Sequence, residues 1–243
     1  MAVTIHSEPR IAWHAPFAAK MAQGLKALGI PSETTNSQQR QSDIAILLGT
    51  TFWRQIEADG RYLLVDRCSF GDTNQYVSLV WDGHGRRGNH CVPENYSYSR
   101  WTVHGVPLKP FASGAKSVIC GQTESYSPHW KLRDWYQAHH RAATHFRPHP
   151  GDAEYEIVRL PVWKTWDDVR IARTLNSSVA IDALINGVEA TVDDYGGMAF
   201  AWSQCNPETD RLRLMRWLAW TQWHHSEIAE GKPIEHILDR IAA

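Results

Sequence analysis

The sequence predicts an α/β protein made of two small halves. Short apolar runs typical of buried strands alternate with segments of helical periodicity, and one long loop divides the chain. The length of 243 residues allows one large domain or two small ones. We therefore expect a first half over residues 1–114 and a second half over residues 115–243.

The first half is expected to begin with a strand at residues 3–6. A helix over residues 16–28 follows, because its apolar residues share one face and Gly29 can end it. Residues 91–114, rich in Tyr, Ser, Pro and Gly, are expected to form the linker. Further strands are expected at residues 43–49, 61–66 and 76–81.

The second half is expected to alternate strands and helices and to end in a long helix over residues 210–230. Apolar residues mark one face of that final helix. Strands are expected at residues 118–120, 145–147, 169–173 and 190–192, and a further helix at residues 130–141.

Residues 174–188 are the most informative stretch, with a strand end, a two-serine turn, a short helix and a glycine stop. Ser177 or Ser178 can cap the helix, because a hydroxyl accepts hydrogen bonds from the unpaired amides of a first turn. The same amides and hydroxyls favour a phosphate. The alternative is an ordinary capped helix in an α/β protein.

A second polar group follows the strand expected at residues 145–147. Proline cannot continue a central strand, so the loop begins at Pro148. Arg147 and His149 then lie near the carboxyl end of a strand, where open α/β sheets bind ligands. The arginine fork suits phosphate, and histidine can donate to a phosphate or sugar oxygen. Lys164 is a spare cation, and two surface residues beside a turn are the alternative.

Together these motifs resemble the donor half of GT-B glycosyltransferases, in particular the bacterial capsule Kdo-type transferases, the bacterial sialyltransferases and compact tailed-phage glycosyltransferases. The resemblance rests on Arg-Pro-His-Pro at residues 147–150, on Asn-Ser-Ser with the helix and glycine that follow at residues 176–187, and on Ile-Cys-Gly-Gln at residues 119–122. It covers about residues 115–205. It implies two Rossmann-like halves facing a cleft, with residues 1–114 on the acceptor side and residues 115–243 on the nucleotide-sugar side. A C-terminal helix would pack across both.

In the similar enzymes the His-Pro and Ser-Ser pairs hold the nucleotide phosphates, and the first strand of the donor half ends in a glycine turn. The paired glycines at residues 196–197 would touch the sugar or the phosphates, although an ordinary turn is the alternative there. The resemblance implies no metal and no cofactor other than the nucleotide-sugar co-substrate. The implied donor set, with Arg147 included, is Gly121, Gln122, Arg147, His149, Asn176, Ser177, Ser178, Gly196 and Gly197.

An inverting sugar transfer needs a base beside the acceptor hydroxyl. Asp66 ends an apolar run, which aims it at the crevice expected between the halves. The similar families carry an acidic-acidic-Gly motif at this place, and this chain has Asp-Arg-Cys at residues 66–68 instead. Asp82 and Asp72 are the competing bases. An ion pair or a turn cap is the non-catalytic alternative for Asp66.

Some of the similar phage glycosyltransferases modify hydroxymethylated pyrimidines in DNA, so the resemblance implies such a base as the acceptor. Arg86, Arg87 and Trp101 would form the basic, aromatic entry that a flipped base needs. The formal charge of −1 gives no global attraction to DNA. A saccharide or lipid-linked acceptor is the rival, and a sugar-nucleotide binding protein without catalysis or a Trp-rich interaction protein are the non-enzymatic readings.

Composition narrows the class of protein further. The four cysteines contain no Cys-x-x-Cys pair, so neither a zinc ribbon nor a thioredoxin motif is expected. No apolar run is long enough to span a bilayer, and the first residues lack the regions of a signal peptide. We expect a cytoplasmic protein, in the host cytoplasm if a phage encodes it.

Overall fold

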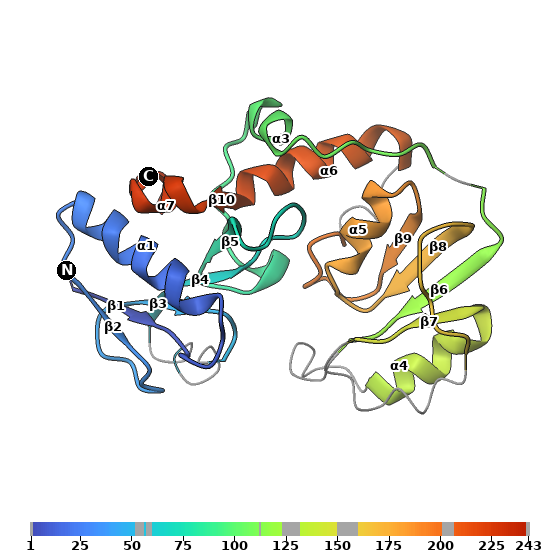
Figure 1. Cartoon of the computed structure of the whole chain (residues 1–243), viewed down its shortest axis with the longest axis horizontal. Helices are drawn as coiled ribbons and strands as arrows, with labels where there is room; N and C mark the ends of the chain where they lie inside the picture. Colours follow the sequence, from blue (N-terminus) through green and yellow to red (C-terminus); the bar gives the residue numbers. More distant parts are fainter. Residues whose placement is uncertain are drawn as a thin grey trace. The chain divides into compact units, whose positions relative to one another are not determined.

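The computed structural model describes residues 2–51, 56, 60–111, 113–122, 132–149, 160–200 and 207–241. The chain divides into two compact units (Figure 1). Unit 1 comprises Met1–His104 with Arg216–Ala243, and unit 2 comprises Gly105–Met215. Each unit has a sheet of mostly parallel strands with helices packed against it, which confirms the predicted α/β class and is consistent with a Rossmann-like arrangement.

Unit 1 is built on a sheet with the strand order β10-β5-β4-β3-β1-β2. The strands β2, β1, β3 and β4 are parallel, whereas β5 and β10 run antiparallel to their neighbours. The strands are β1 (Val3–His6), β2 (Ser32–Thr35), β3 (Ile44–Leu48), β4 (Arg61–Arg67), β5 (Tyr76–Trp81) and β10 (Gln222–His224). The helices are α1 (His14–Ala27), α3 (Ser99–His104), α7 (His225–Ala229) and α8 (Lys232–Ile241), with the short 3-10 helix η2 (Gly85–Arg87).

Alternation along the strands divides the apolar side chains of unit 1 between two faces of the sheet. On β4, Leu63 and Val65 belong to the core cluster that includes α1, α7 and α8, while Tyr62 and Leu64 belong to a smaller cluster on the other face. Gly24 brings α1 against α7 so closely that a Cβ there would lie 2.0 Å from the carbonyl oxygen of Ile228. The helix expected over residues 16–28 is confirmed, and Gly29 ends it with a φ of 70°.

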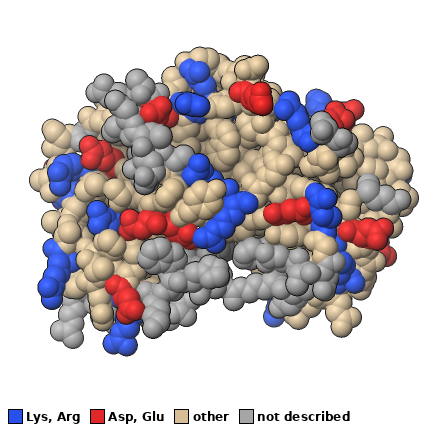
Figure 2. All heavy atoms as spheres, turned by 180° about the vertical axis from the view of Figure 1, so that it is seen from behind, with Lys and Arg blue, Asp and Glu red and all other residues tan. Residues whose placement is uncertain are grey.

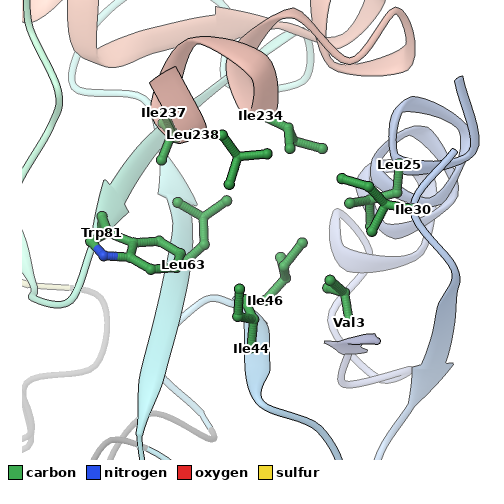
Figure 3. Close-up of a pocket in the computed structure, with 10 residues that line it drawn as sticks. All are labelled: Val3, Leu25, Ile30, Ile44, Ile46, Leu63, Trp81, Ile234, Ile237 and Leu238. Atoms are coloured by element: carbon green, nitrogen blue, oxygen red, sulfur yellow. The ribbon is translucent and has the colours of Figure 1, made fainter. Parts of the chain in front are cut away.

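A small apolar cavity of about 30 Å³ lies in unit 1 between the sheet, α1 and α8 (Figure 3). Its ten lining residues come from both ends of the chain, with Val3 and Ile44 on strands and Ile234 on α8. A space this small with almost no polar lining stays dry. It is a packing defect of the core at the amino end of the strands.

Unit 2 is built on the fully parallel strand order β7-β6-β8-β9. The chain leaves β6 for its neighbour on one side and leaves β8 for its neighbour on the other, so a topological switch point lies between β6 and β8. The strands are β6 (Lys116–Cys120), β7 (His145–Arg147), β8 (Val169–Thr174) and β9 (Glu189–Val192). The helices are α4 (Leu132–His139) and α5 (Val179–Ile185), with η4 (His140–Ala142) after α4.

The prediction of a single helix over residues 210–230 is wrong. Helix α6 (Pro207–Thr221) ends where Gln222–His224 pairs with β5 as strand β10. The Gln222 side chain explains this break: its Oε1 accepts from the amides of Ser69 and Phe70, and its Nε2 donates to the Phe70 carbonyl. The amide side chain thus fixes the C-terminal segment to the loop after β4.

The division into units also differs from the expected boundary at residue 114. Helix α3 lies within the expected linker and belongs to unit 1. Arg100 of this helix forms a bidentate ion pair with Glu227 of α7, with N···O distances of 2.8 and 3.0 Å. Arg100 also donates to the carbonyls of Ala219 and Gln222. The C-terminal segment is therefore part of unit 1, although the sequence analysis assigned it to the second half. None of the described helices has an apolar stretch that would reach across a bilayer.

Candidate functional site

The carboxyl edge of the unit 2 sheet carries a chain of side-chain hydrogen bonds across the switch point. Gln122, which follows β6, donates from Nε2 to Oδ1 of Asn176, which follows β8. Asn176 donates from Nδ2 to Oδ2 of Asp194 at 2.9 Å, and the amide of Gly196 donates to the other oxygen of Asp194 at 3.1 Å. The structure thus brings together three residues of the expected donor set from three separate strand ends.

Buried groups next to this network fix the positions of its residues. The Tyr136 hydroxyl accepts from the amide of Gln122 at 2.9 Å and lies 3.2 Å from the Gln122 carbonyl, to which it donates. Gly197 packs against the same turn, since a Cβ there would lie 3.0 Å from Cα of Asn176. Gly197 therefore serves the close packing of two loops. A close approach to a ligand, which the sequence analysis inferred for it, is not needed to explain the glycine.

The start of α5 differs from the expected phosphate site. Ser178 occupies the N-cap position, and Oγ of the preceding Ser177 accepts from the amide of Val179, the first helical residue, at 3.3 Å. The next two amides, of Ala180 and Ile181, donate to the carbonyls of Ser177 and Ser178. The amide of Ser177 itself donates to Oγ1 of Thr174. The first-turn amides are thus engaged within the chain, and Ser178 makes no capping bond with its side chain.

Arg147 lies at the carboxyl end of β7, as the sequence predicted. Its carbonyl accepts from the amide of Gly121 at 2.7 Å, so the ends of β6 and β7 adjoin. The guanidinium carbon lies 5.2 Å from the centre of the Trp163 ring, and Nε is buried without a hydrogen-bond partner among the described residues. His149 is half-buried two positions beyond, whereas Pro150 of the same motif lies outside the described residues.

A second polar group at this edge joins Asp193 to Trp135 and His139, a grouping that the sequence did not predict. Asp193 accepts from Nε1 of Trp135 at 2.8 Å and lies 3.3 Å from Nε2 of His139. The other ring nitrogen of His139 lies 2.7 Å from a guanidinium nitrogen of Arg173. Burial lowers the pKa of His139, and the Asp193 carboxylate opposes that effect. The spacing of Trp135 and His139 on one helix face was the available signal.

In unit 1, Asp66 lies near the carboxyl end of β4 with its side chain about a third exposed. Its Oδ1 accepts from the amide of Arg67 at 2.8 Å, and its Oδ2 lies 3.8 Å from Nε2 of His84. The structure therefore adds an imidazole to the carboxylate that the sequence named as the first candidate base. The sequence analysis did not name His84 as a partner of this carboxylate.

The competing bases have structural roles at other places. Asp82 has a φ of 46°, forms an ion pair with Arg61 and accepts from the amide of Tyr62 at 2.8 Å. It closes the amino end of β4, the opposite edge from Asp66, so the two carboxylates do not share one site. Asp72 accepts from the amide of Asn74 at 2.9 Å and shapes the turn before β5.

The residues of the expected acceptor entry lie on two elements of unit 1, η2 and α3. The glycine-rich loop at residues 82–90 is packed, since the amide and carbonyl of Trp81 both bond to Asn89 and a Cβ at Gly83 would lie 2.2 Å from Cα of Gly88. Arg86 and Arg87 lie in η2 of this loop. Trp101 lies on α3, where its ring packs edge to face against Phe70 with the centroids 5.2 Å apart.

On the face shown in Figure 2, Lys and Arg are interspersed with Asp and Glu, which matches the formal charge of −1.

One buried imidazole at the carboxyl edge of unit 1 was missed from the sequence. His14 is the first residue of α1 and is fully buried, with Nδ1 3.0 Å from the amide of Glu8. A single histidine in an apolar helix pattern carries no signal of such a role, because only the fold brings it beside the ends of β3 and β4.

Comparisons with known proteins leave the family open. No family model matches the sequence, and no curated protein matches it. Among solved structures, the apo-structure of D-lactate dehydrogenase from Escherichia coli is 11% identical, with 78% of this chain and 73% of that chain covered and a TM-score of 0.22. A likeness this low carries no argument about the function of this chain.

Proposed function

We propose that this chain is a glycosyltransferase of the GT-B type that takes a sugar from a nucleotide-sugar donor. The observation that supports it best is Arg147, which ends a parallel strand with its Nε buried and without a hydrogen-bond partner among the described residues. A buried donor that lacks a partner is costly, and a phosphate oxygen satisfies a guanidinium with charge-assisted hydrogen bonds. The donor phosphates are therefore proposed to lie at Arg147 and His149.

The neighbouring amide network supports the same proposal. Gln122 and Asn176 lie at the switch point, where open α/β sheets bind ligands. Ser177 and Ser178 lie at the same edge, where the exposed Ser178 hydroxyl can contact a phosphate without disturbing the helix cap. Asp66 is the proposed base, assisted by His84.

The acceptor is proposed to be an alcohol. A hydroxymethylated pyrimidine in DNA stays a prediction from the resemblance, and two features weigh against a basic entry for it. Arg100 is committed to Glu227, and the glycine-rich loop that carries Arg86 and Arg87 is packed. A saccharide acceptor needs no such entry.

The test is a thermal-shift screen with CMP-, UDP- and GDP-sugars. A donor at one hundred times its dissociation constant adds about 2.7 kcal/mol of stability, which corresponds to a rise in Tm of roughly 5–10 °C for a chain of this size. Arg147→Gln should weaken donor binding by about 10- to 100-fold, the loss expected for one hydrogen bond to a charged group.

Arg170→Gln is the matched control, because Arg170 is exposed on strand β8 of the same sheet. It should keep the full shift in Tm. The proposal fails if none of the sugar nucleotides stabilises the protein, or if the two arginine variants respond alike. Mass spectrometry shows whether a bound donor loses its sugar. Binding without such loss would instead favour the alternative of a sugar-nucleotide binding protein without catalysis.

A further inference from the structure

Tyr195 lies in the turn that follows β9, at the carboxyl edge of the unit 2 sheet. It is 53% exposed, and its ring meets that of Phe200 edge to face with the centroids 5.6 Å apart. The contact with Phe200 supports the ring while about half of the residue stays open to solvent. Open α/β sheets bind their ligands at this edge, so an exposed aromatic ring here can contact a planar group of a ligand.

Hydrogen bonds of Asp194 hold this turn in place. The Asp194 carboxylate accepts from Asn176 at 2.9 Å and from the amide of Gly196 at 3.1 Å. The Asp194 carbonyl accepts from the amide of Gly197 at 2.9 Å. These bonds use two amides of the turn within the chain, so the turn does not offer them to a phosphate. They also fix the residue next to Asp194, which is Tyr195, beside the amide network at the switch point.

The two ends of this edge differ in charge. At the β7 end, Arg147 is cationic and is the proposed contact of the donor phosphates. At the β9 end, Asp193 and Asp194 are the two residues that lead into the turn. Arg173 lies 2.7 Å from Nδ1 of His139 and can only donate, so that imidazole has a lone pair and is neutral. Two carboxylates against one guanidinium disfavour a phosphate at the β9 end, whereas a neutral ring carries no such cost.

The order of the strands sets the separation of the two ends. The sheet order β7-β6-β8-β9 puts three strand spacings between β7 and β9, which is roughly 14 Å. An extended nucleoside diphosphate bridges such a distance when side chains reach toward it from both ends. A donor with its phosphates at Arg147 would cross the switch point and bring its base to Tyr195.

We infer that Tyr195 stacks on the nucleobase of the donor. The inference rests on the proposed function and identifies the subsite of the base. Every nucleobase has a π face, so stacking on an aromatic side chain adds affinity for a nucleotide without choosing among the bases. A pyrophosphate has no ring and gains nothing from this contact.

The experiment is isothermal titration calorimetry on the full chain with CMP, UDP and GDP, and with pyrophosphate as a probe of the phosphate end alone. We expect at least one of the nucleotides to bind more tightly than pyrophosphate. Tyr195→Ala should weaken that nucleotide about 5- to 100-fold, the loss expected for one stacked base. The same variant should leave the dissociation constant of pyrophosphate unchanged, which also shows that unit 2 is folded.

Tyr195→Phe keeps the ring and should keep the nucleotide affinity. Tyr98→Ala is the matched control, because Tyr98 is 50% exposed and belongs to unit 1. It should leave the affinities for nucleotide and for pyrophosphate unaltered.

An unchanged nucleotide affinity in Tyr195→Ala overturns the inference and leaves the proposed function standing. An equal loss for nucleotide and pyrophosphate overturns it too, because the ring would then act on the phosphate end. A loss that appears with the sugar nucleotide and not with the nucleotide alone would put the sugar at Tyr195, against the inference. If neither the nucleotides nor pyrophosphate binds, the proposed function fails together with this subsite.

Discussion

The two units share a class of fold and differ in the chemistry at the carboxyl ends of their strands. Unit 1 places ionisable groups there, the carboxylate of Asp66 with the imidazoles of His84 and His14. Unit 2 places the amides of Gln122 and Asn176 there, together with ionisable groups such as Arg147 and the pair of Asp193 with His139. Amides bind without changing charge, whereas imidazoles and carboxylates can move protons. The two edges thus differ in the neutral amide network that lies in unit 2.

The units also differ in which segments of the chain supply the strands of their sheets. The sheet of unit 1 gains its antiparallel edge from β10 near the C-terminus, so its core combines two distant segments of the chain. The sheet of unit 2 is fully parallel and is formed within one continuous segment. Damage to a single packing contact should therefore affect one unit and spare the other.

Asp66→Asn should have the largest effect, because it removes the proposed base. We expect a loss of about 10²- to 10⁴-fold in kcat with the donor dissociation constant unchanged. Single-turnover assays and donor titrations measure the two quantities. Asp72→Asn and Asp82→Asn are the controls, and normal turnover in Asp66→Asn would remove the proton-transfer role from unit 1.

Gly24→Ala should unfold unit 1 selectively. The new Cβ would lie 2.0 Å from the Ile228 carbonyl oxygen, so α1 and α7 must separate at a cost of about 3 kcal/mol. Gly29→Ala has open space around it and a φ of 70°, so it should cost only about 1 kcal/mol. Hydrogen exchange followed by mass spectrometry should show lost protection in β1 and α1 and unchanged protection in β6 and β8. Equal loss in both units would contradict their independence.

Asn176→Ala tests the amide network of unit 2. The change leaves Nε2 of Gln122 and Oδ2 of Asp194 without this partner, and Asp194 is only 4% exposed. We expect a loss of about 2 kcal/mol, the cost of buried groups deprived of a hydrogen bond. Asn186→Ala, which removes bonds within the C-terminal turn of α5, should cost less than about 1 kcal/mol. Chemical unfolding gives both values. Similar losses in the free energy of unfolding would show that the network contributes no more to stability than the bonds of Asn186.

Acid should destabilise unit 1 through its buried imidazoles. Burial, followed by the charge of Arg100, lowers the pKa of His104 from 6.5 to about 4. The unfolded chain therefore binds more protons between these values, so stability is complete above pH 6.5 and falls as the pH drops toward 4. After allowance for solvent screening we expect about 1–2 kcal/mol from His104. Urea unfolding of wild type and His104→Phe across this range measures it, and an identical pH dependence would exclude His104 as the cause.

The local patterns of the sequence determined most of the elements. Apolar runs and helical periodicity predicted β1, β3, β4, β5 and α1, and the two-serine turn predicted the start of α5. These signals depend on neighbouring residues alone. The polar strand β2 was missed, since its sequence, Ser-Glu-Thr-Thr, has no apolar residue and it lies at the edge of the sheet. Arg147 and Asp66 were placed correctly because each directly follows or ends a predicted strand.

Tertiary structure decided which groups meet. The residues of β10 read as the continuation of a helix, and only pairing with β5 and the bonds of Gln222 to the loop after β4 made them a strand. The amides at the start of α5 were expected to be open, yet backbone carbonyls and Ser177 itself engage them. His14 lies more than thirty residues from Gly49 in sequence, and the packing of α1 on the sheet alone turns its ring toward that turn. Periodicity describes what one segment buries, whereas the partner of a polar atom depends on a distant segment that folding brings to it.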